Sequence, residues 1–437
     1  MTQSGTQSGK KTPADGLTRR RFLQTSAATA GAAAGAGVLG APMIWAQELK
    51  DVTLNWAGPS YSVIADIAEK ASADLGFNIV PQTVESTALM AKVVNQPETI
   101  DIADLEFWAM QKVWRSGQVQ PVDVAKIANW GMMTPLMREG KNFDGSDLSR
   151  QGTMPAEVMY IAAAGDTEFA ASPTELATIM PTIYNADTVG IRSDLIGRPI
   201  ESWAELFNPE FKGKTALLNI PSIGIMDAAM VVEAMGIYKY PDKGNMTKKE
   251  IDLTIKTLIE AKRQGQFRAL WKDFNESVNL MASGEVVIQS MWSPAVTAVR
   301  TKGVACNFQP LKEGTRAWAA GFGLPATLSG RKLDGAYEFI NWFLDGWAGA
   351  YLNRQGYYSA VLETAKSKME AYEWAYWMEG KPAARDIKGP NGDVLAKAGE
   401  VRDGGSYEAR MGSIACWNAV MDENNYMVQK WNEFVAA

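Results

Sequence analysis

The sequence predicts an α/β fold built as two lobes with a cleft between them. Strand-like and helix-like patterns alternate after residue 50, and a second alternating series begins near residue 188. Such alternation favours sheets of largely parallel strands that are covered by helices. The chain has 437 residues, of which 46% are hydrophobic. A chain of this size and composition divides into two domains more readily than it builds one core.

The first series predicts three strands and three helices. We expect the strands at 51–56, 77–84 and 100–105, and the helices at 63–71, 89–94 and 110–114. Ligands of parallel sheets bind beyond the carboxyl ends of the strands. Trp56 and residues 106–108, which follow the first and third strands, are therefore expected at the rim of a binding site.

The second series follows a less regular region that is rich in Met, Gly and Pro. We expect strands at 188–191, 215–219, 286–290 and 306–310, with helices at 225–235 and 251–263. An amphipathic helix is predicted over 334–351, and a last helix over 420–435. Gly, Pro and charged residues dominate 380–406, which predicts an exposed insertion.

The N-terminus carries the pattern of a twin-arginine export signal. Arg-Arg-Arg-Phe-Leu at 19–23 precedes an Ala/Gly-rich run at 27–39, and small residues lead to Ala46. We expect residues 1–46 to be recognised by the twin-arginine translocation machinery and removed, so that the mature protein works in the periplasm. The alternative is an uncleaved membrane anchor, which the scarcity of Leu, Ile and Phe in the run disfavours.

The composition excludes several classes of function. The chain has no histidine, which removes Ser-His-Asp chemistry and the metal sites that need imidazole. Cys306 and Cys416 are the only cysteines, too few for an iron–sulfur cluster or a Cys-rich zinc site. Two buried thiols are the favoured state, and a disulfide is the alternative that an oxidising compartment permits. We therefore expect no cofactor and no metal.

The charge balance restricts the partners. The net charge is −6, and loss of residues 1–46, which hold five bases and one acid, changes it to −10. An acidic chain without a basic stripe is a poor partner for nucleic acid. We expect no nucleic-acid partner and a monomeric protein.

Several motifs follow one another along the mature chain. The most diagnostic is SWAELFNPEFKGK at 202–214, preceded by PTIYNADTVGI at 181–191. The others come in this order: Ser-Gly-Glu-Val at 283–286, Trp292, Trp318, Leu-Pro-Ala at 324–326 and Gly356-Tyr357. This series resembles the spermidine/putrescine-binding group of the periplasmic solute-binding proteins of ABC importers.

The resemblance implies a type II-like periplasmic-binding-protein fold with a hinge and an interlobe cleft. Such a protein is no enzyme: it closes on a small solute and delivers it to a membrane permease. The chain would cross between lobes near 181–190 and 318–325. Lobe 1 would comprise 47–182 and 320–405 and lobe 2 would comprise 183–319, while the helical segment 406–437 is assigned to neither lobe.

The resemblance also implies a ligand site with aromatic walls. Its aromatic positions correspond to Trp56, Trp108, Trp292, Trp318 and Tyr357. Each ring of this kind contributes ~0.5–2 kcal/mol when it faces an ammonium group.

Most acidic anchors of that group are missing here. Gly58 and Ala320 stand at two of the acidic positions, and Ile223 and Met226 stand at the pair that opens the helix after 215–219. A buried diammonium needs paired carboxylates. We therefore expect a ligand with one cationic head, or a polar organic amine.

Other polar residues are candidate replacements for these anchors. Glu106 stands on the same rim, Asp227 and Glu276 lie close to the expected positions, and Asn418 belongs to a Trp-Asn pair that resembles a Trp-Gln pair of the group. Two other classes stay open: a receptor for a neutral solute such as a sugar, and a secreted glycoside hydrolase, which needs two carboxylates but no histidine. The Tyr357-Tyr358 pair also raises a ferric-ion receptor, against which Tyr357 already has a place in the Gly-Tyr motif.

Overall fold

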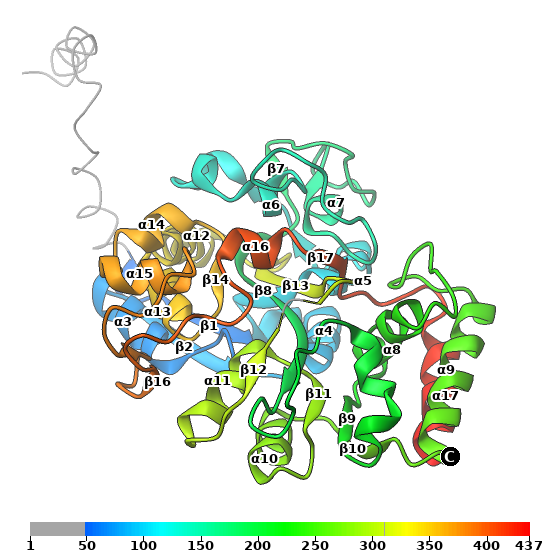
Figure 1. Ribbon diagram of the computed structural model, residues 1–437. Coiled ribbons are helices and arrows are strands. Elements are labelled where there is room, and N and C mark those ends of the chain that lie inside the picture. Colours follow the sequence, from blue (N-terminus) through cyan, green and yellow to red (C-terminus); the bar gives the residue numbers. More distant parts are fainter. Residues whose placement is uncertain (1–48, 310) are drawn as a thin grey trace, which may run out of the picture. The chain divides into compact units, whose positions relative to one another are not determined.

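A computed structural model describes residues 49–309 and 311–437 (Figure 1). The predicted export signal at 1–46 lies outside the described residues, and the rest of the text concerns the unit from Leu49 to Ala437. Within the described ranges, no helix combines the length and the apolar character needed to cross a bilayer.

A long sheet runs through this unit, with two long antiparallel strands at its centre (Figure 1). These central strands are β8 (Met180–Ile191) and β13 (Thr315–Pro325). Beyond β13 lie three mutually parallel strands in the order β3 (Ile102–Glu106), β1 (Thr53–Gly58) and β2 (Asn78–Thr83). Beyond β8 lies a second parallel trio in the order β11 (Ile288–Met291), β9 (Thr215–Leu218) and β10 (Phe267–Trp271). The strands expected at 215–219 and 286–290 are thus present as β9 and β11, whereas the sequence did not predict β10.

Helices cover both trios. Those around β1–β3 are α3 (Ala65–Leu75), α4 (Ser86–Asn95), α5 (Met110–Arg115), α12 (Gly330–Leu344), α13 (Trp347–Arg354), α14 (Leu362–Lys366) and α15 (Ala371–Trp377). Those around β9–β11 are α8 (Pro221–Ala234), α9 (Lys248–Arg263), α10 (Phe274–Ser283), α11 (Ser293–Thr301) and α17 (Asn424–Ala436).

Shorter elements complete the fold. The irregular region after α5 holds β4 (Val119–Gln120), β5 (Val122–Asp123), α6 (Pro135–Arg138), α7 (Pro155–Val158), β6 (Tyr160–Ile161) and β7 (Leu176–Ala177). Elsewhere there are β12 (Asn307–Phe308), β14 (Tyr358–Ser359), β15 (Ile387–Lys388), β16 (Val394–Ala396), α16 (Tyr407–Met411) and β17 (Ile414–Trp417).

The hydrophobic core changes along the two central strands. On β8, Ala186 belongs to the core of the first trio, whereas Val189 belongs to the core of the second. Between Leu311 and Ala317 the chain returns to the first core. The strands β8 and β13 therefore connect the two lobes. We propose that lobe 1 ends within β8 and resumes within β13, a few residues from the boundaries expected at 182 and 320.

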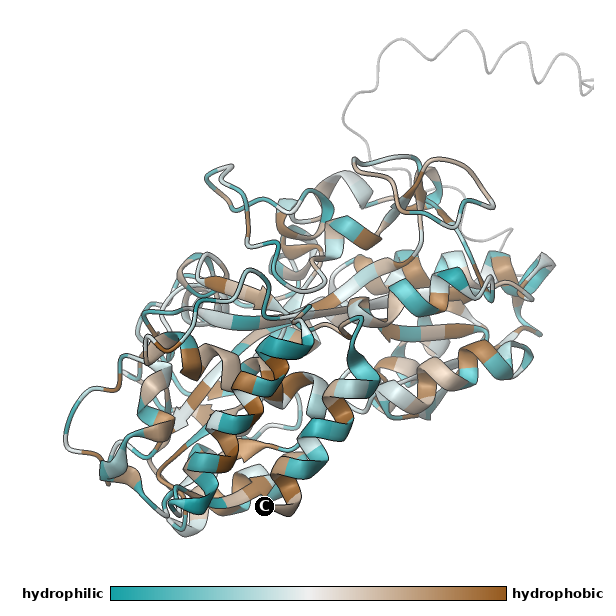
Figure 2. Cartoon of the chain, turned by 90° about the vertical axis from the view of Figure 1, so that its right-hand side faces the viewer, coloured by the Kyte–Doolittle hydropathy of each residue, from teal (hydrophilic) through white to brown (hydrophobic). Residues whose placement is uncertain are grey.

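The C-terminal segment divides between the two cores. Trp417 packs in the first core, whereas Trp431 and Phe434 of α17 pack in the second. The indole of Trp431 also donates to Asn219 Oδ1 at 2.8 Å. Figure 2 shows hydrophobic residues gathered where the helices near the C-terminus pack on one another. We propose that α17 belongs to lobe 2.

Two sequence predictions about the chain after residue 330 need correction. The single helix expected over 334–351 is two helices, because Gly346 adopts φ 109° between α12 and α13. A Cβ at Gly346 would lie 2.1 Å from the carbonyl oxygen of Thr364, so only glycine fits this turn.

The stretch 380–406 is more than an exposed insertion. Its β15–β16 hairpin lies near α11, and the buried Arg402 donates to the carbonyl oxygen of Gly356 at 3.2 Å. The neighbouring Asp403 pairs with Arg300 of α11 and accepts from the backbone of Phe308 at 3.1 Å. The segment thus connects the last part of the chain to lobe 2.

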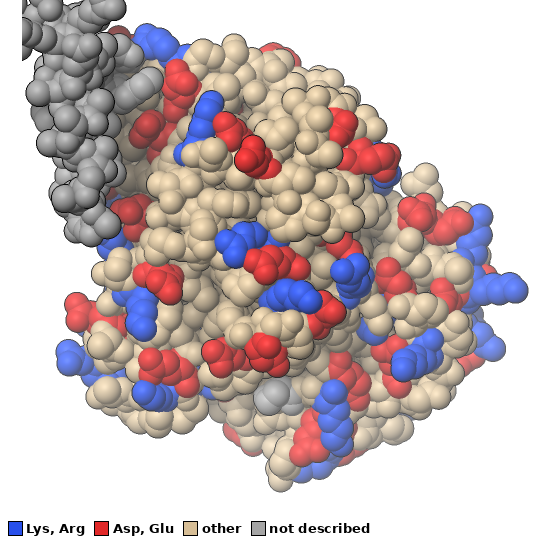
Figure 3. All heavy atoms as spheres, turned by 90° about the horizontal axis from the view of Figure 1, so that it is seen from above, with Lys and Arg blue, Asp and Glu red and all other residues tan. Residues whose placement is uncertain are grey.

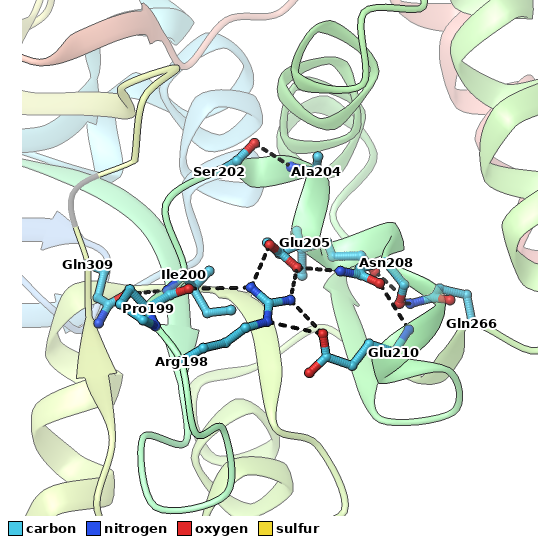
Figure 4. Close-up of polar contacts among 11 residues, drawn as sticks. Arg198, Pro199, Ile200, Ser202, Ala204, Glu205, Asn208, Glu210, Gln266 and Gln309 are labelled. Carbon is cyan, nitrogen blue, oxygen red and sulfur yellow. Dashed lines mark hydrogen bonds and ion pairs between the residues drawn. The ribbon is translucent and has the colours of Figure 1, made fainter.

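The most diagnostic motif has a structural role (Figure 4). Arg198 binds both carboxylate oxygens of Glu205, at 2.8 and 2.7 Å, and Glu210 at 2.6 Å. Within the motif Asn208 accepts from the backbone of Glu210, and Gln266 binds the carbonyl oxygen of Asn208 from outside it. These contacts fix the chain before β9, and none of these residues lines the cavity described below.

The surface carries both signs of charge. On the face that Figure 3 shows, acidic and basic side chains are interspersed. Cys306 and Cys416 are both buried and are not bonded to each other, so they are present as the two thiols that the sequence favours.

Candidate functional site

A cavity of about 1270 Å³ lies between the two lobes, where strands of both trios end. Pro59 and Glu106 line it from the ends of β1 and β3, and Ile220, Lys272 and Trp292 line it just after β9, β10 and β11. This is the position at which α/β sheets bind ligands.

The cavity brings together six of the nine predicted site residues. The residues that line it are Glu106, Trp108, Trp292, Trp318, Tyr357 and Asn418. Those that do not are Trp56, Asp227 and Glu276.

Trp56 is a core residue, which corrects its assignment to the rim. Its side chain is 0% exposed and meets Phe322, Phe339 and Phe343 edge to face, with ring centroids 5.3–6.1 Å apart. The reason is that β1 continues to Gly58, so Trp56 lies within the strand and faces α12 rather than the cleft.

Asp227 and Glu276 are occupied by structural contacts. Asp227 is fully buried on α8, where its Oδ1 accepts from Arg316 Nε at 2.7 Å. Burial raises the pKa of Asp227, and the Arg316 guanidinium opposes the rise. Arg316 also donates to Asn418 Oδ1 at 2.7 Å, so this pair ties α8 to β13 and orients one lining residue. Glu276 accepts from the backbone of Lys272 at 2.9 Å, at the start of α10.

Glu106 is the centre of a hydrogen-bond cluster on the lobe 1 wall. Its Oε1 accepts from the Tyr61 hydroxyl at 3.0 Å and from Ser86 Oγ at 2.6 Å. Its Oε2 accepts from the indole Nε1 of Trp108. Burial, reinforced by the Glu106 carboxylate, raises the pKa of Tyr61 well above its ordinary value. We call Glu106, Tyr61, Ser86 and Trp108 the Glu106 cluster.

Sequence reasoning missed Tyr61 and Ser86. Tyr61 lies between β1 and α3, and Ser86 begins α4, so only the fold brings them to the end of β3. The one available signal was that each residue lies in the segment between a predicted strand and the helix that follows it.

Three aromatic rings lie together beside this cluster. The ring centroids of Tyr61 and Trp318 are 4.8 Å apart, and Tyr357 lies 6.2 Å from Tyr61 and 6.0 Å from Trp318. On the lobe 2 side, Trp292 lines the cavity and meets the buried Trp271 edge to face at 4.8 Å. The cavity therefore has aromatic surfaces on both sides.

Asp187 is a lining residue that the sequence did not predict. It lies on β8, is 1% exposed, and accepts from the backbone N–H of Ser293 at 3.1 Å through Oδ1. Its Oδ2 has no partner among the described residues. Burial raises its pKa to about 6, while the Arg316 guanidinium acts in the opposite direction. Asp187 is the one charged residue of the crossover strand, and this was the signal for it.

Asp104 is a second buried acid, behind Glu106 on β3. Ser62 and the indole of Trp56 lie beside its carboxyl, but no described residue makes a hydrogen bond of normal geometry with it. Burial raises its pKa to about 8, so it is mostly protonated near neutral pH. Asp104 therefore adds little negative charge to the cavity.

The lining is acidic overall. Among the described residues that line the cavity there is one cation, Lys272, against five acids: Glu85, Glu106, Asp187, Asp273 and Asp393. The described chain has no cluster of three or more His, Cys, Asp or Glu side chains placed to hold a metal ion. The described lining is thus rich in acids and aromatic rings and poor in cations.

Two α/β lobes around an acidic, aromatic cavity define a periplasmic-type solute-binding protein. The family model described as bacterial extracellular solute-binding protein matches residues 63–373, and the chain belongs to this family. Its members bind solutes and are not enzymes, which excludes the glycoside hydrolase considered from the sequence.

Known proteins agree with this assignment. The chain is 26% identical over 314 residues to the spermidine/putrescine-binding periplasmic protein of Salmonella typhimurium, covering 71% of this chain and 77% of the relative. A putative spermidine/putrescine ABC transporter from Listeria monocytogenes has the same fold, with a TM-score of 0.60 and 15% identity over 88% of this chain and 98% of the other. The Atu4243-GABA receptor superposes with a TM-score of 0.54 and 17% identity, over 88% and 97% of the two chains. The chain is thus a polyamine-binding-like, substrate-binding protein of the ABC transporter type.

Proposed function

We propose that this protein is the periplasmic substrate-binding component of an ABC importer and that it binds a small organic amine between aromatic walls. The observation that supports this most is the Glu106 cluster, a carboxylate held by three donors beside Trp318 and Tyr357. The cavity lining, with five acids and one lysine, has the charge that an amine requires.

The proposed binding mode follows from these contacts. The ammonium group lies between Glu106 and Asp187 and faces the rings of Trp318 and Tyr357. The donors to Glu106 hold the carboxylate in place before the ligand arrives, so little ordering is needed on binding. The unpartnered Oδ2 of Asp187 gains a hydrogen bond from the ammonium, which offsets the cost of its burial.

The remaining parts of the proposal concern the route and the partners. Residues 1–46 direct export by the twin-arginine machinery, and the mature monomer closes on its ligand by movement about β8 and β13. The closed form then docks on a membrane permease, which takes up the solute.

Two measurements on the purified mature protein test the proposal. Thermal unfolding is followed with putrescine, spermidine, n-butylamine and a panel of sugars, and we expect amines to raise Tm in proportion to the logarithm of their concentration. Native mass spectrometry of freshly purified protein should show a nitrogen base as the bound molecule. A response to sugars with none to amines would overturn the proposal and favour a receptor for neutral solutes.

A further inference from the structure

The lobe 2 wall of the cavity differs in charge from the lobe 1 wall. Ser222 and Ile223 line it from the first turn of α8, and Lys272 lines it from the residue after β10. The first turn of α8 contains no acid, at the place where the resemblance predicts an acidic pair.

Strand register places these two features next to each other. β9 and β10 are parallel neighbours with Leu218 opposite Trp271, and the backbone N–H of Asn219 donates to the Trp271 carbonyl at 2.6 Å. Lys272 therefore follows the strand beside the one that leads, through Ile220, into α8.

The start of α8 offers unpaired donors. α8 is 14 residues long, its N-cap residue Ile220 makes no side-chain cap, and Pro221 occupies the first turn. Within the described chain, neither the backbone N–H nor the hydroxyl of Ser222 has a hydrogen-bond partner. Free N–H groups and the helix dipole together favour an anionic group at such a terminus.

The ammonium group of Lys272 has no carboxylate partner in the described chain, because the two acids nearby in sequence bind backbone groups instead. Asp273 accepts from the backbone of Glu276 at 2.9 Å, and Glu276 accepts from the backbone of Lys272. Both acids thus cap the start of α10 and make no ion pair with the Lys272 ammonium.

A second, independent feature of the cavity also points to a ligand. Asp187 lines the cavity and is 1% exposed, and its Oδ2 has no partner among the described residues, so a cationic group bound there would offset the cost of its burial. One part of the cavity therefore favours a cation, while another offers a lysine and a helix start to an anion.

We infer that the ligand is an amino carboxylate, with its ammonium at Glu106 and Asp187 and its carboxylate at Ser222 and Lys272. This inference rests on the proposed amine-binding function and narrows its substrate class. A diamine would place its second ammonium beside the ammonium of Lys272, whose positive charge opposes it. The relatives named for spermidine and putrescine would then differ from this chain at the lobe 2 wall.

Calorimetric titration with matched ligands tests the inference. γ-Aminobutyrate is compared with n-butylamine, and β-alanine and δ-aminovalerate with n-propylamine and n-pentylamine, so that each pair differs only in the carboxylate. We expect at least one amino carboxylate to bind about tenfold more tightly than its amine and than putrescine, as a charge-assisted pair provides.

Substitutions locate the effect. Lys272→Gln should lower the affinity for the amino carboxylate relative to the affinity for the plain amine, and Lys272→Arg should restore most of this ratio. Lys302→Gln, which removes an exposed lysine of lobe 2 outside the cavity, is the matched control and should change neither affinity.

The outcomes separate this inference from the proposed function. The inference of an amino carboxylate ligand is wrong if plain amines or putrescine bind as tightly as the amino carboxylates. It is also wrong if Lys272→Gln leaves the ratio of the affinities for the amino carboxylate and its matched amine unchanged. In both cases the proposed amine-binding function is unaffected. If neither amines nor amino carboxylates bind, the proposed function fails and the inference fails with it.

Discussion

The two walls of the cavity are organised in different ways. On the lobe 1 wall, Glu106 already accepts three hydrogen bonds from protein side chains. On the lobe 2 wall, Ser222 and the Lys272 ammonium have no partners within the described chain. A satisfied charge keeps its position without a ligand, whereas unpaired groups gain most when a ligand arrives. Lobe 1 is thus the preorganised wall, and we propose that lobe 2 closes onto the ligand.

The largest expected effect concerns the core behind the preorganised wall. Trp56→Ala should lower the free energy of unfolding by about 3–5 kcal/mol, because it removes a large side chain that is 0% exposed. Ligand affinity of the remaining folded protein should stay within about threefold, a tolerance of less than 1 kcal/mol. Chemical denaturation and calorimetry measure the two quantities. A large loss of affinity with unchanged stability would return Trp56 to the binding site.

The second effect concerns the centre of the lobe 1 wall. Glu106→Gln should weaken amine binding by about 1.5–3 kcal/mol, since a charged hydrogen-bond acceptor is lost. Glu85→Gln is the control, because Glu85 lines the same cavity and belongs to no hydrogen-bond cluster of side chains in the described chain. An equal loss in both variants, measured by calorimetry, would mean that the cavity attracts amines only through its overall charge.

The third effect is the pH dependence of binding. The folded pKa of Asp187 is raised to about 6, so the carboxylate that binds an ammonium forms as the pH rises through that value. Between pH 5 and pH 7 the affinity for an amine should rise about tenfold, and Asp187→Asn should flatten the profile. The charged groups near Asp187 act in opposite directions. Arg316 and Arg410 favour its ionised form, whereas the Asp227 carboxylate disfavours that form. The hydroxyl-bearing ring of Tyr357 also lies near the Asp187 carboxylate.

The raised pKa of Asp187 also predicts how the stability of the folded protein changes with pH. A carboxyl whose pKa is higher in the folded than in the unfolded protein costs stability as the pH rises from about 4 to above 6. The unliganded protein should therefore lose stability over this range through Asp187, and Asp187→Asn should lose less. A steeper loss in the variant would contradict the assignment.

The smallest effect concerns one aromatic ring. Trp318→Leu should weaken amine binding by ~0.5–2 kcal/mol through loss of the cation–π contact, and Trp318→Phe by less. For a neutral isostere of the amine the two variants should differ little from the wild type. If calorimetry shows a larger loss of affinity for the amine than for the isostere, the aromatic ring recognises the charge of the ligand. Equal losses would mean that the ring only excludes water.

Much of this fold follows from patterns in the sequence. The alternation of apolar strands and helices predicted the trio β1–β3 and two strands of the second trio, β9 and β11, but missed β10, and the motif at 181–191 corresponds to the central strand β8. Trp292, Trp318 and Tyr357, which the resemblance assigned to the ligand site, line the cavity, and their contact with a ligand stays a prediction. These features depend on local periodicity or on motifs, which a single sequence contains.

The missed features depend on strand ends and on distant contacts. Trp56 was placed on the rim because β1 was expected to end there, whereas the strand continues to Gly58 and the Trp56 side chain packs in the core. Asp187 lay inside a motif that was interpreted only as a crossover. Tyr61 and Ser86 reach Glu106 from separate elements, and no local pattern encodes that convergence.

A crystal structure of the protein with a bound amine is the most direct measurement of where the ligand's charge lies. The expected result is an ammonium nitrogen about 2.7–2.9 Å from a carboxylate oxygen of Glu106, facing the rings of Trp318 and Tyr357. A ligand that lies in the same cavity with its nitrogen away from both Glu106 and Asp187 would contradict the assignment of the acidic wall.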